Sequence, residues 1–173
     1  IYRYLMEIGS CARSLQNMRQ AIKSIIRIVR ALKHYSHLDQ GGMVRTDIRE
    51  SLENTIIIMN SVLKGEVEME RQFGEVVPIV CNPDELGQVW TNLITNAYHA
   101  LRPQGGGKIL IRTWQEGAGE VAVSISDNGP GIPEAIAGRI WDPFFTTKDQ
   151  GEGSGLGLGI VRGIVQRHHA RIT

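Results

Sequence analysis

Cysteine is nearly absent from the sequence, with two residues in a chain of 173. Cys11 and Cys81 lie far apart, and neither belongs to a Cys-x-x-Cys pair or to a cluster with histidine. This scarcity argues against a disulfide framework and against a structural zinc site. The two thiols are instead typical of buried side chains in a reducing compartment.

The sequence also lacks an excess of charge and a long hydrophobic run. Nineteen Lys and Arg residues against eighteen Asp and Glu residues give a formal net charge of +1, and no basic stripe is interleaved with aromatic residues. We therefore expect no nucleic-acid partner. No apolar segment approaches the ~20 residues of a membrane span, and the first residues lack a signal-peptide pattern. We expect no direct membrane contact by this chain and a cytoplasmic location, within a parent protein that can itself be membrane-anchored.

Hydrophobic residues make up 42% of the chain, which is enough for a buried core, and their spacing divides the sequence near residue 40. Before that point, apolar residues recur every three or four positions from Leu15 to Tyr35, with basic residues between them. This pattern predicts a long amphipathic helix whose length suits a coiled-coil or four-helix dimer seam. A surface helix packed on its own domain is the alternative.

The part after residue 40 alternates between helical and extended patterns. Helical spacing predicts helices over residues 48–63 and 83–101, the second opened by the cap signals Asn82 and Pro83. Alternation predicts strands in "VEMERQF", "GKILIRTW" and "GEVAVSISD", the last two forming a hairpin, and a further helix follows "GSGLG". The order predicts an α/β (α+β) two-layer sandwich, with helices on one face of a mixed sheet and the long dimerisation helix before it.

The helix predicted for residues 83–101 carries a polar stripe at helical spacing that includes Asn92, Asn96 and His99. Two asparagines four residues apart present carboxamide oxygens on one face. Such oxygens suit a partly hydrated Mg²⁺ that is held mainly by phosphates. A solvated polar face is the alternative interpretation of this motif taken alone.

A second motif, "SDNGPGIP", follows the strand that carries Val121, Val123 and Ile125 on one face. Asp127 at the strand end can accept a hydrogen bond from an exocyclic amine. Gly129 and Gly131 let the backbone turn against a flat ring. A tight turn with no ligand explains the same residues, because Asp, Asn, Gly and Pro are common turn formers.

The third motif is "GEGSGLGLGIV", which places glycine at every second position from Gly151 to Gly159. Small residues at positions 153–155 let backbone N–H groups approach an anion, and a helix beginning near Leu156 points its positive end at the same place. The motif lacks the Lys-Ser/Thr ending of a Walker loop and does not follow a strand as a Rossmann fingerprint does. A flexible linker is disfavoured because branched apolar residues follow at once.

These three motifs occur in a fixed order, with "WDPFFTTKDQ" between the second and the third. Together they resemble the ATP-binding domain of sensor histidine kinases, in the ATPase superfamily shared with gyrase, heat-shock chaperones and mismatch-repair proteins. The resemblance covers about residues 38–172. In it, Asn92 and Asn96 match the asparagine box, Asp127, Gly129 and Gly131 the first glycine box, Phe144 and Phe145 the phenylalanine box, and Gly153, Gly155 and Gly157 the second glycine box.

The resemblance implies ATP and Mg²⁺ as cofactors and a role for each matching residue. Asp127 would read the adenine amine, and Asn96, assisted by Asn92, would hold Mg²⁺ as the catalytic pair. Protonated His99 would contact phosphate, and Lys148 in a mobile lid would touch the terminal phosphate. The implied nucleotide-binding set is Asn92, Asn96, His99, Asp127, Gly129, Gly131, Ile132, Phe145, Thr147, Lys148, Gly153, Ser154, Gly155, Leu156, Gly157 and Leu158.

The same resemblance implies a domain organisation and partners. Residues 1–40 would be the second part of a helical dimerisation hairpin, and residues 41–173 an ATP-binding kinase domain that is incomplete at its C-terminus. None of the five histidines has the setting of the family's phosphoacceptor, so we expect the acceptor upstream of Ile1. The implied partners are a second copy of the chain, through the N-terminal helix, and the receiver domain of a response regulator.

The implied activity is that of a protein-histidine kinase, which transfers the γ-phosphoryl group of ATP to a histidine and then to a response regulator. Hydrolytic relatives place a glutamate, as general base for water, four residues before the metal-binding asparagine, and this sequence has Asn92 there. Asparagine cannot take a proton, which favours transfer to a protein histidine. The alternatives are an anti-sigma-type serine kinase and a non-catalytic nucleotide-sensing dimerisation module.

Overall fold

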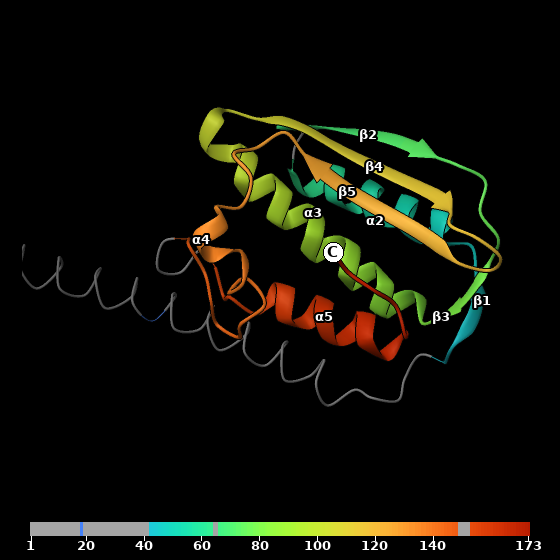
Figure 1. Cartoon of the computed structure of the whole chain (residues 1–173). Coiled ribbons are helices and arrows are strands. Elements are labelled where there is room, and N and C mark those ends of the chain that lie inside the picture. The colour runs from blue at the N-terminus through green and yellow to red at the C-terminus, as the bar shows by residue number, and fades with distance from the viewer. Residues whose placement is uncertain (1–17, 19–41, 64–65, 149–152) are drawn as a thin grey trace, which may run out of the picture. The chain divides into compact units, whose positions relative to one another are not determined.

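The computed structural model describes residues 18, 42–63, 66–148 and 153–173. The chain divides into two compact units, and the larger comprises residues 41–145 and 155–173. Residues 146–148, 153 and 154, together with Met18, are the described part of the other unit. The dimerisation helix expected within residues 1–40 lies outside the described residues, except for Met18. All helices and strands below belong to the larger unit (Figure 1).

The centre of the larger unit is a three-stranded mixed sheet in the order β2-β4-β5. Strands β2 (Val67–Phe73) and β4 (Gly107–Gln115) pair in parallel, and β4 pairs antiparallel with β5 (Val121–Asp127). The predicted hairpin between β4 and β5 is therefore confirmed. Ile111 is opposite Ile125, so the alternating apolar residues of both strands face the same side.

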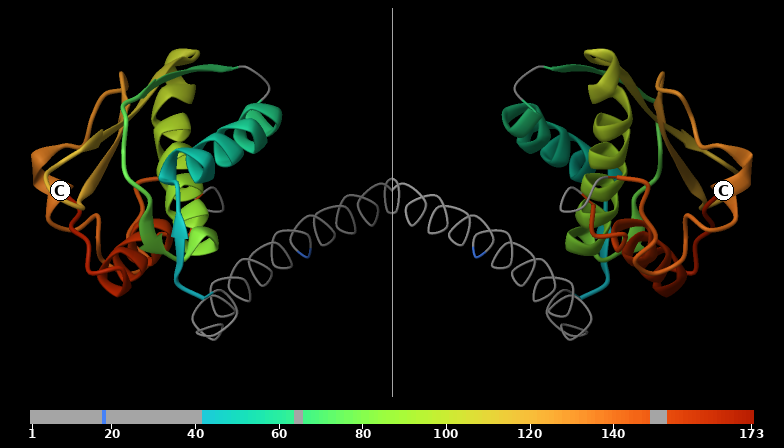
Figure 2. Two further views of the ribbon diagram at one scale, coloured as in Figure 1. Left: turned by 90° about the vertical axis from the view of Figure 1, so that its right-hand side faces the viewer. Right: turned by 90° about the vertical axis from the view of Figure 1, so that its left-hand side faces the viewer.

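Three helices pack on one side of this sheet: α2 (Ile48–Leu63), α3 (Pro83–Leu101) and α5 (Gly157–Arg167). Figures 1 and 2 show α3 crossing the sheet, with α2 along one flank of α3 and α5 along the other. The two-layer arrangement is confirmed. The buried core consists of Ile48, Leu52, Ile56, Met59, Leu63, Val67, Cys81, Leu86, Val89, Trp90, Ile94, Ala97, Leu101, Ile109, Ile111, Val161 and Ile164.

Helix α3 is the central helix of the layer, because it contacts α2, α5, β4 and β5. It therefore buries a wider face than a helix lying only on a sheet. Val89 and Ile94 are buried, whereas Leu93 is only partly buried. Within α3 only Asp84 and Thr91 are exposed, while Asn92, Asn96 and His99 are partly buried.

Two short strands were not predicted from the sequence. Strand β1 (Val44–Thr46) pairs antiparallel with β3 (Ile79–Cys81), apart from the main sheet. Three residues are too few for alternation to be recognised, and the partners are more than thirty positions apart in the sequence. The structure also adds a 3₁₀ turn at Arg102–Gln104 and the single-turn helix α4 (Glu134–Ala137).

The start of α3 is fixed by its cap and by the end of α5. The Asn82 side chain accepts hydrogen bonds from the amides of Asp84 (3.1 Å) and Glu85 (3.2 Å), which confirms the predicted cap. The Asn82 amide donates to Nε2 of His168 (3.0 Å), just past the end of α5. Arg167 also pairs with Glu85 (2.7 Å). These contacts hold the C-terminal end of α5 against the first turn of α3.

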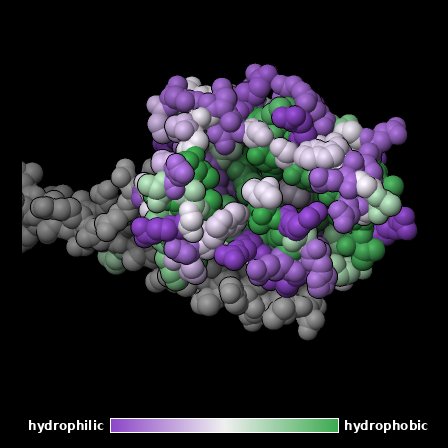
Figure 3. All heavy atoms as spheres, in the orientation of Figure 1, coloured by the Kyte–Doolittle hydropathy of each residue, from purple (hydrophilic) through white to green (hydrophobic). Residues whose placement is uncertain are grey.

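The apolar residues of β5 remain partly accessible. Val121, Val123 and Ile125 pack against the core without being fully buried. Figure 3 shows hydrophobic surface in the middle of this face of the molecule, below a hydrophilic upper rim. This partly accessible face of β5 leads to Asp127 at the end of the strand.

Candidate functional site

The middle of α3 presents the two predicted asparagines. Asn92, Asn96 and His99 are all partly buried, and four residues along a helix separate the asparagines by about 6 Å. The Nδ2 atom of Asn92 is buried and has no hydrogen-bond partner among the described residues. A buried polar group without a partner is unfavourable unless a ligand satisfies it. The amide can also rotate to offer its oxygen at the same place.

The first residue of α5 lies directly beside Asn92. A Cβ atom added to Gly157 would be 3.3 Å from Oδ1 of Asn92. The N-cap residue of α5, Leu156, makes no side-chain hydrogen bond to the first turn of the helix. The first backbone N–H groups of a helix have no partner within the helix and carry partial positive charge. The structure thus places amide donors of α5, where Gly157 and Leu158 lie, next to the unpaired Asn92 amide.

The segment before α5 is joined to the phenylalanine motif through the backbone. The Phe144 amide donates to the carbonyl oxygen of Gly155 (2.9 Å). Gly155 has a φ of 65°, and an added Cβ would lie only 2.2 Å from the carbonyl carbon of Phe144. Only glycine fits such a close approach. Leu156 is the N-cap residue of α5 and follows directly, while the Phe145 ring lies under the guanidinium of Arg139 at 4.7 Å.

The turn after β5 is held in place by Asp127 and Asn128. The Gly129 amide donates to Oδ1 of Asp127 (2.9 Å), and this is the bond that forms the turn. Asn128 accepts a hydrogen bond from the Lys108 amide through Oδ1 (2.8 Å) and donates its own amide to the Lys108 carbonyl (3.3 Å). These two bonds attach the turn to the start of β4. The Asp127 carboxylate is exposed and stands at the rim of the turn.

Glycines in this turn allow it to approach α3. A Cβ at Gly129 would lie 2.7 Å from Asp127 Oδ1 and 3.3 Å from the Cβ of Ala100. Gly131 has a φ of 75°, which favours glycine, and the neighbouring Ile132 is exposed. Ala100 is eight residues beyond Asn92 on α3, or about 12 Å along the helix axis. One helix therefore borders the Asp127 turn at one end and the α5 N-terminus at its middle.

The structure assigns four predicted residues to the other compact unit. Thr147, Lys148, Gly153 and Ser154 belong to it, and within that unit the Lys148 amide donates to Oγ1 of Thr146 (3.2 Å). An added Cβ at Gly153 would lie 2.4 Å from the same oxygen, so the two ends of this segment approach closely. A role of these four residues in nucleotide binding stays a prediction.

Sequence reasoning missed two residues that shape the site. The sequence motif indicates only a turn-forming role for Asn128, although its side chain attaches the turn to β4. Its position between Asp127 and Gly129 was the available signal, since asparagine often bonds nearby backbone in turns. The contact of Arg139 with the Phe145 ring could not be predicted, because a single arginine forms no recognisable sequence pattern.

The side chains of Asn92 and Asn96 offer amide oxygens to a metal ion. No group of three or more His, Cys, Asp or Glu side chains that could hold a metal ion occurs in the described part of the chain. A magnesium ion near Asn92 and Asn96 would therefore need most of its ligands from phosphates and water, which is the usual arrangement for this ion.

The described residues include no helix that is long and apolar enough to cross a membrane.

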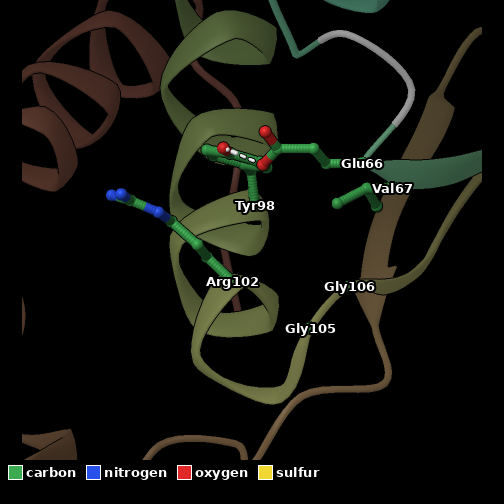
Figure 4. Close-up of a pocket in the computed structure, with 6 residues that line it drawn as sticks. All are labelled: Glu66, Val67, Tyr98, Arg102, Gly105 and Gly106. Atoms are coloured by element: carbon green, nitrogen blue, oxygen red, sulfur yellow. Dashed lines mark hydrogen bonds between the residues drawn. The ribbon is translucent and has the colours of Figure 1, made fainter.

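A separate pocket of about 250 Å³ lies between the C-terminal end of α3 and the start of β2, and no predicted site residue lines it. Figure 4 shows Tyr98 and Glu66 pointing toward one another across it, while Arg102 points away. The Tyr98 hydroxyl donates to Oε2 of Glu66 (2.5 Å), and this hydrogen bond raises the pKa of Tyr98. On its other side the Tyr98 ring lies near that of His99, with centroids 5.5 Å apart.

Comparisons with known proteins agree with this geometry. The family described as histidine kinase-, DNA gyrase B- and HSP90-like ATPase matches residues 81–173. The signal transduction histidine-protein kinase AtoS of Escherichia coli K12 is 32% identical over 153 residues, which cover 87% of this chain and 24% of AtoS. This chain thus spans about a quarter of the length of that relative.

Solved structures show the same fold. The mycobacterial sensor histidine kinase MprB superposes with a TM-score of 0.64 and 26% identity, covering 73% of this chain and 80% of that chain. Histidine kinase ThkA, solved in complex with the response regulator protein TrrA, gives a TM-score of 0.68 and 25% identity, covering 87% of this chain and 42% of that chain. The family resemblance and the fold class predicted from the sequence are both confirmed.

Proposed function

Because the chain belongs to the family of histidine kinase-, DNA gyrase B- and HSP90-like ATPases, we propose that it is the ATP-binding part of a protein-histidine kinase. The observation that carries this proposal is the buried Asn92 amide, which has no partner among the described residues and lies beside the N-terminus of α5. The Asn92 amide lacks an acceptor among the described residues, and the first N–H groups of a helix have no partner within the helix. The phosphates of a nucleotide supply acceptors of the right charge.

The adenine end of the site is assigned to the turn after β5. Asp127 is the acceptor for the exocyclic amine, because the Gly129 amide occupies one of its oxygens and the carboxylate is otherwise exposed. The hydrogen bond from the Lys108 amide to Asn128 attaches this turn to the start of β4. Gly129, Gly131 and Ile132 border the base, and the absence of a side chain at Gly129 keeps the turn close to Ala100.

The phosphate end is assigned to α5 and the middle of α3. Gly155, Leu156, Gly157 and Leu158 lie at the start of α5, where the partial positive charge of the helix N-terminus favours an anion. Mg²⁺, bound together with ATP, supplies charge neutralisation for phosphoryl transfer. Asn92 and Asn96 are the residues that would hold it, and both belong to one face of α3.

Further contacts with the nucleotide are assigned by the sequence resemblance. His99 and Phe145 border the site in the larger unit, while Thr147, Lys148, Gly153 and Ser154 belong to the segment that would cover the phosphates. In the larger unit, Phe145 is placed by the turn that Phe144 and Gly155 hold together. We assign no base for water activation to Asn92, because its amide cannot take a proton.

The acceptor in this proposal is a histidine outside the chain, and the phosphoryl group then passes to a response regulator. ThkA, one of the structural relatives, is known in complex with the response regulator TrrA, which supports a partner of that class. We also propose a homodimer through the N-terminal helix of residues 1–40 and a cytoplasmic location. We propose no nucleic-acid partner, because the balanced charge of the sequence provides no long-range attraction for a polyanion.

The test is calorimetric titration of the chain with ATP in the presence and absence of Mg²⁺. Asp127→Asn keeps an oxygen for the Gly129 amide but removes the charged acceptor of the adenine amine. A hydrogen bond with a charged partner contributes about 1.5–3 kcal/mol, so we expect affinity to fall at least about tenfold.

The matched control is Glu120→Gln, which removes the same charge just before the other end of β5. Glu120 is exposed, and its 3.7 Å contact with Arg171 is the kind of surface ion pair that contributes little. Equal affinity of Asp127→Asn and the unchanged chain for ATP would contradict the proposed adenine site.

A further inference from the structure

A groove of about 450 Å³ runs between α2 and α3 on the side away from the main sheet, apart from the proposed nucleotide site. Figure 2 shows these two helices side by side, with the sheet on the opposite flank. Helix α2 lines the groove with Glu50, Ser51, Asn54, Thr55 and Ile58. Helix α3 lines it with Asp84, Gly87 and Thr91.

Gly87 makes the groove deep, and the fold does not require a glycine there. It lies inside α3, where glycine is less favourable than any residue except proline. An added Cβ would meet only Oγ1 of Thr55, at 3.9 Å, which is ordinary contact. Its backbone has no positive φ. The missing side chain therefore leaves room between the helices that a larger residue could fill without disturbing the chain.

The hydroxyl groups along the groove already have partners inside the molecule. Thr55 donates to the Ser51 carbonyl (3.0 Å), and Thr91 donates to the Gly87 carbonyl (2.8 Å). The Ser51 hydroxyl accepts from the Trp90 indole (3.3 Å). The Thr55 and Thr91 hydroxyls and the Trp90 indole would keep these hydrogen bonds under an apolar side chain, which lowers the desolvation cost of covering them.

The two ends of the groove differ in character. At one end, Glu50 and Asp84 line it, neither carboxylate has an ion-pair partner among the described residues, and no basic residue belongs to the lining. At the other end Ile58 is 63% exposed, and Val62, one turn further along α2, is also 63% exposed. Exposed apolar side chains one turn apart form a stripe that a partner helix can cover.

We propose that this groove binds an amphipathic helix of a partner protein. A large apolar side chain of that helix occupies the space over Gly87, further apolar residues cover Ile58 and Val62, and basic residues lie against Glu50 and Asp84. The negative charge at one end of the groove requires positive charge on the partner helix, and it sets the direction in which that helix lies. This inference is independent of the proposed nucleotide site.

The probe is a synthetic peptide of about 18 residues, long enough to form a helix, with leucine on one face and lysine on the other. The matched peptide carries glutamate in place of every lysine. Each is added to the isotope-labelled 173-residue chain while amide resonances are followed by NMR. We expect the lysine peptide to shift the resonances of Asn54, Gly87 and Thr91 at saturable concentrations, and the glutamate peptide to leave them unchanged.

The decisive variant is Gly87→Leu, which fills the groove and increases the helix propensity of α3, so the fold is retained. We expect it to weaken binding of the lysine peptide at least about tenfold, as loss of a central anchor does. Gly163→Leu, a matched change inside α5, should leave binding unaltered. Unchanged affinity after Gly87→Leu, equal binding of both peptides, or shifts confined to other residues would overturn the proposal. Self-association of the chain that Gly87→Leu abolishes would also overturn it, in favour of a second copy as occupant.

Discussion

Replacing Gly155 with alanine tests the close contact between the phenylalanine motif and the start of α5. The φ of 65° at Gly155 would cost alanine about 1–2 kcal/mol. The new Cβ would also overlap the Phe144 carbonyl carbon, at 2.2 Å, so the two backbones must separate. Loss of the hydrogen bond from the Phe144 amide adds about 1 kcal/mol. The expected total is about 2–3 kcal/mol of lost stability.

Gly159→Ala, four residues further on, is the matched control and should have the opposite sign. Gly159 lies within α5, and an added Cβ there meets no atom within 4 Å. Alanine should therefore stabilise the helix by roughly 0.5–1 kcal/mol. Urea unfolding, followed by tryptophan fluorescence, to which buried Trp90 contributes, measures both changes.

The same pair of variants separates stability from binding. Moving Gly155 shifts the amides at the start of α5, so Gly155→Ala should weaken ATP binding more than adenosine binding in titrations of the folded protein. Gly159→Ala should bind both as the unchanged chain does. If Gly155→Ala unfolds at the same urea concentration as the unchanged chain, or if both variants shift the midpoint in one direction, the reasoning from this contact is refuted.

Two further predictions follow from side chains that hold loops and caps. Asn128→Ala removes the acceptor for the Lys108 amide. It should lower the free energy of unfolding in urea by about 1 kcal/mol and weaken ATP binding. Preserved affinity for ATP would show that the turn is held without the Asn128 side chain. The pKa of Asp47 is lowered, chiefly by its hydrogen bond with the Arg49 side chain. The ionised carboxylate therefore stabilises the fold at pH values above its unfolded pKa, and this contribution is lost as the pH falls through the lower folded pKa. Asp47→Asn should therefore reduce the loss of stability between pH 6 and about pH 3, measured by urea unfolding at both values, and an unaltered pH dependence would argue against that contribution.

Periodic patterns predicted the larger elements of this fold correctly. The spacing of Ile48, Leu52 and Ile56 placed a helix where α2 is found, and all three are buried. The cap at Asn82 was predicted because its oxygen and the following proline act locally. Local rules of this kind depend only on neighbouring residues, so one sequence suffices to apply them.

Contacts between distant segments could not be predicted in the same way. The pairing of β1 with β3 depends on residues that have no pattern of their own. The sequence identified the glycines near residue 155 as a phosphate motif, but not the approach of Gly155 to Phe144, which is a backbone contact that no side chain signals. The orphaned amide of Asn92 is a property of burial, and burial on α3 depends on its contacts with α2, α5, β4 and β5.

The anchoring of α5 at its far end has a consequence for how the site can adapt. Residues 157–167 span about 15 Å, and the end of that span is tied to the first turn of α3 by His168 and Arg167, with Val161 and Ile164 buried between. The first turn of α5, which carries the amide donors, is held separately by the hydrogen bond between the Phe144 amide and the Gly155 carbonyl. A small rotation of α5 about the His168 contact would displace its first turn. Substitutions at His168 should therefore alter phosphate affinity from the opposite end of the helix.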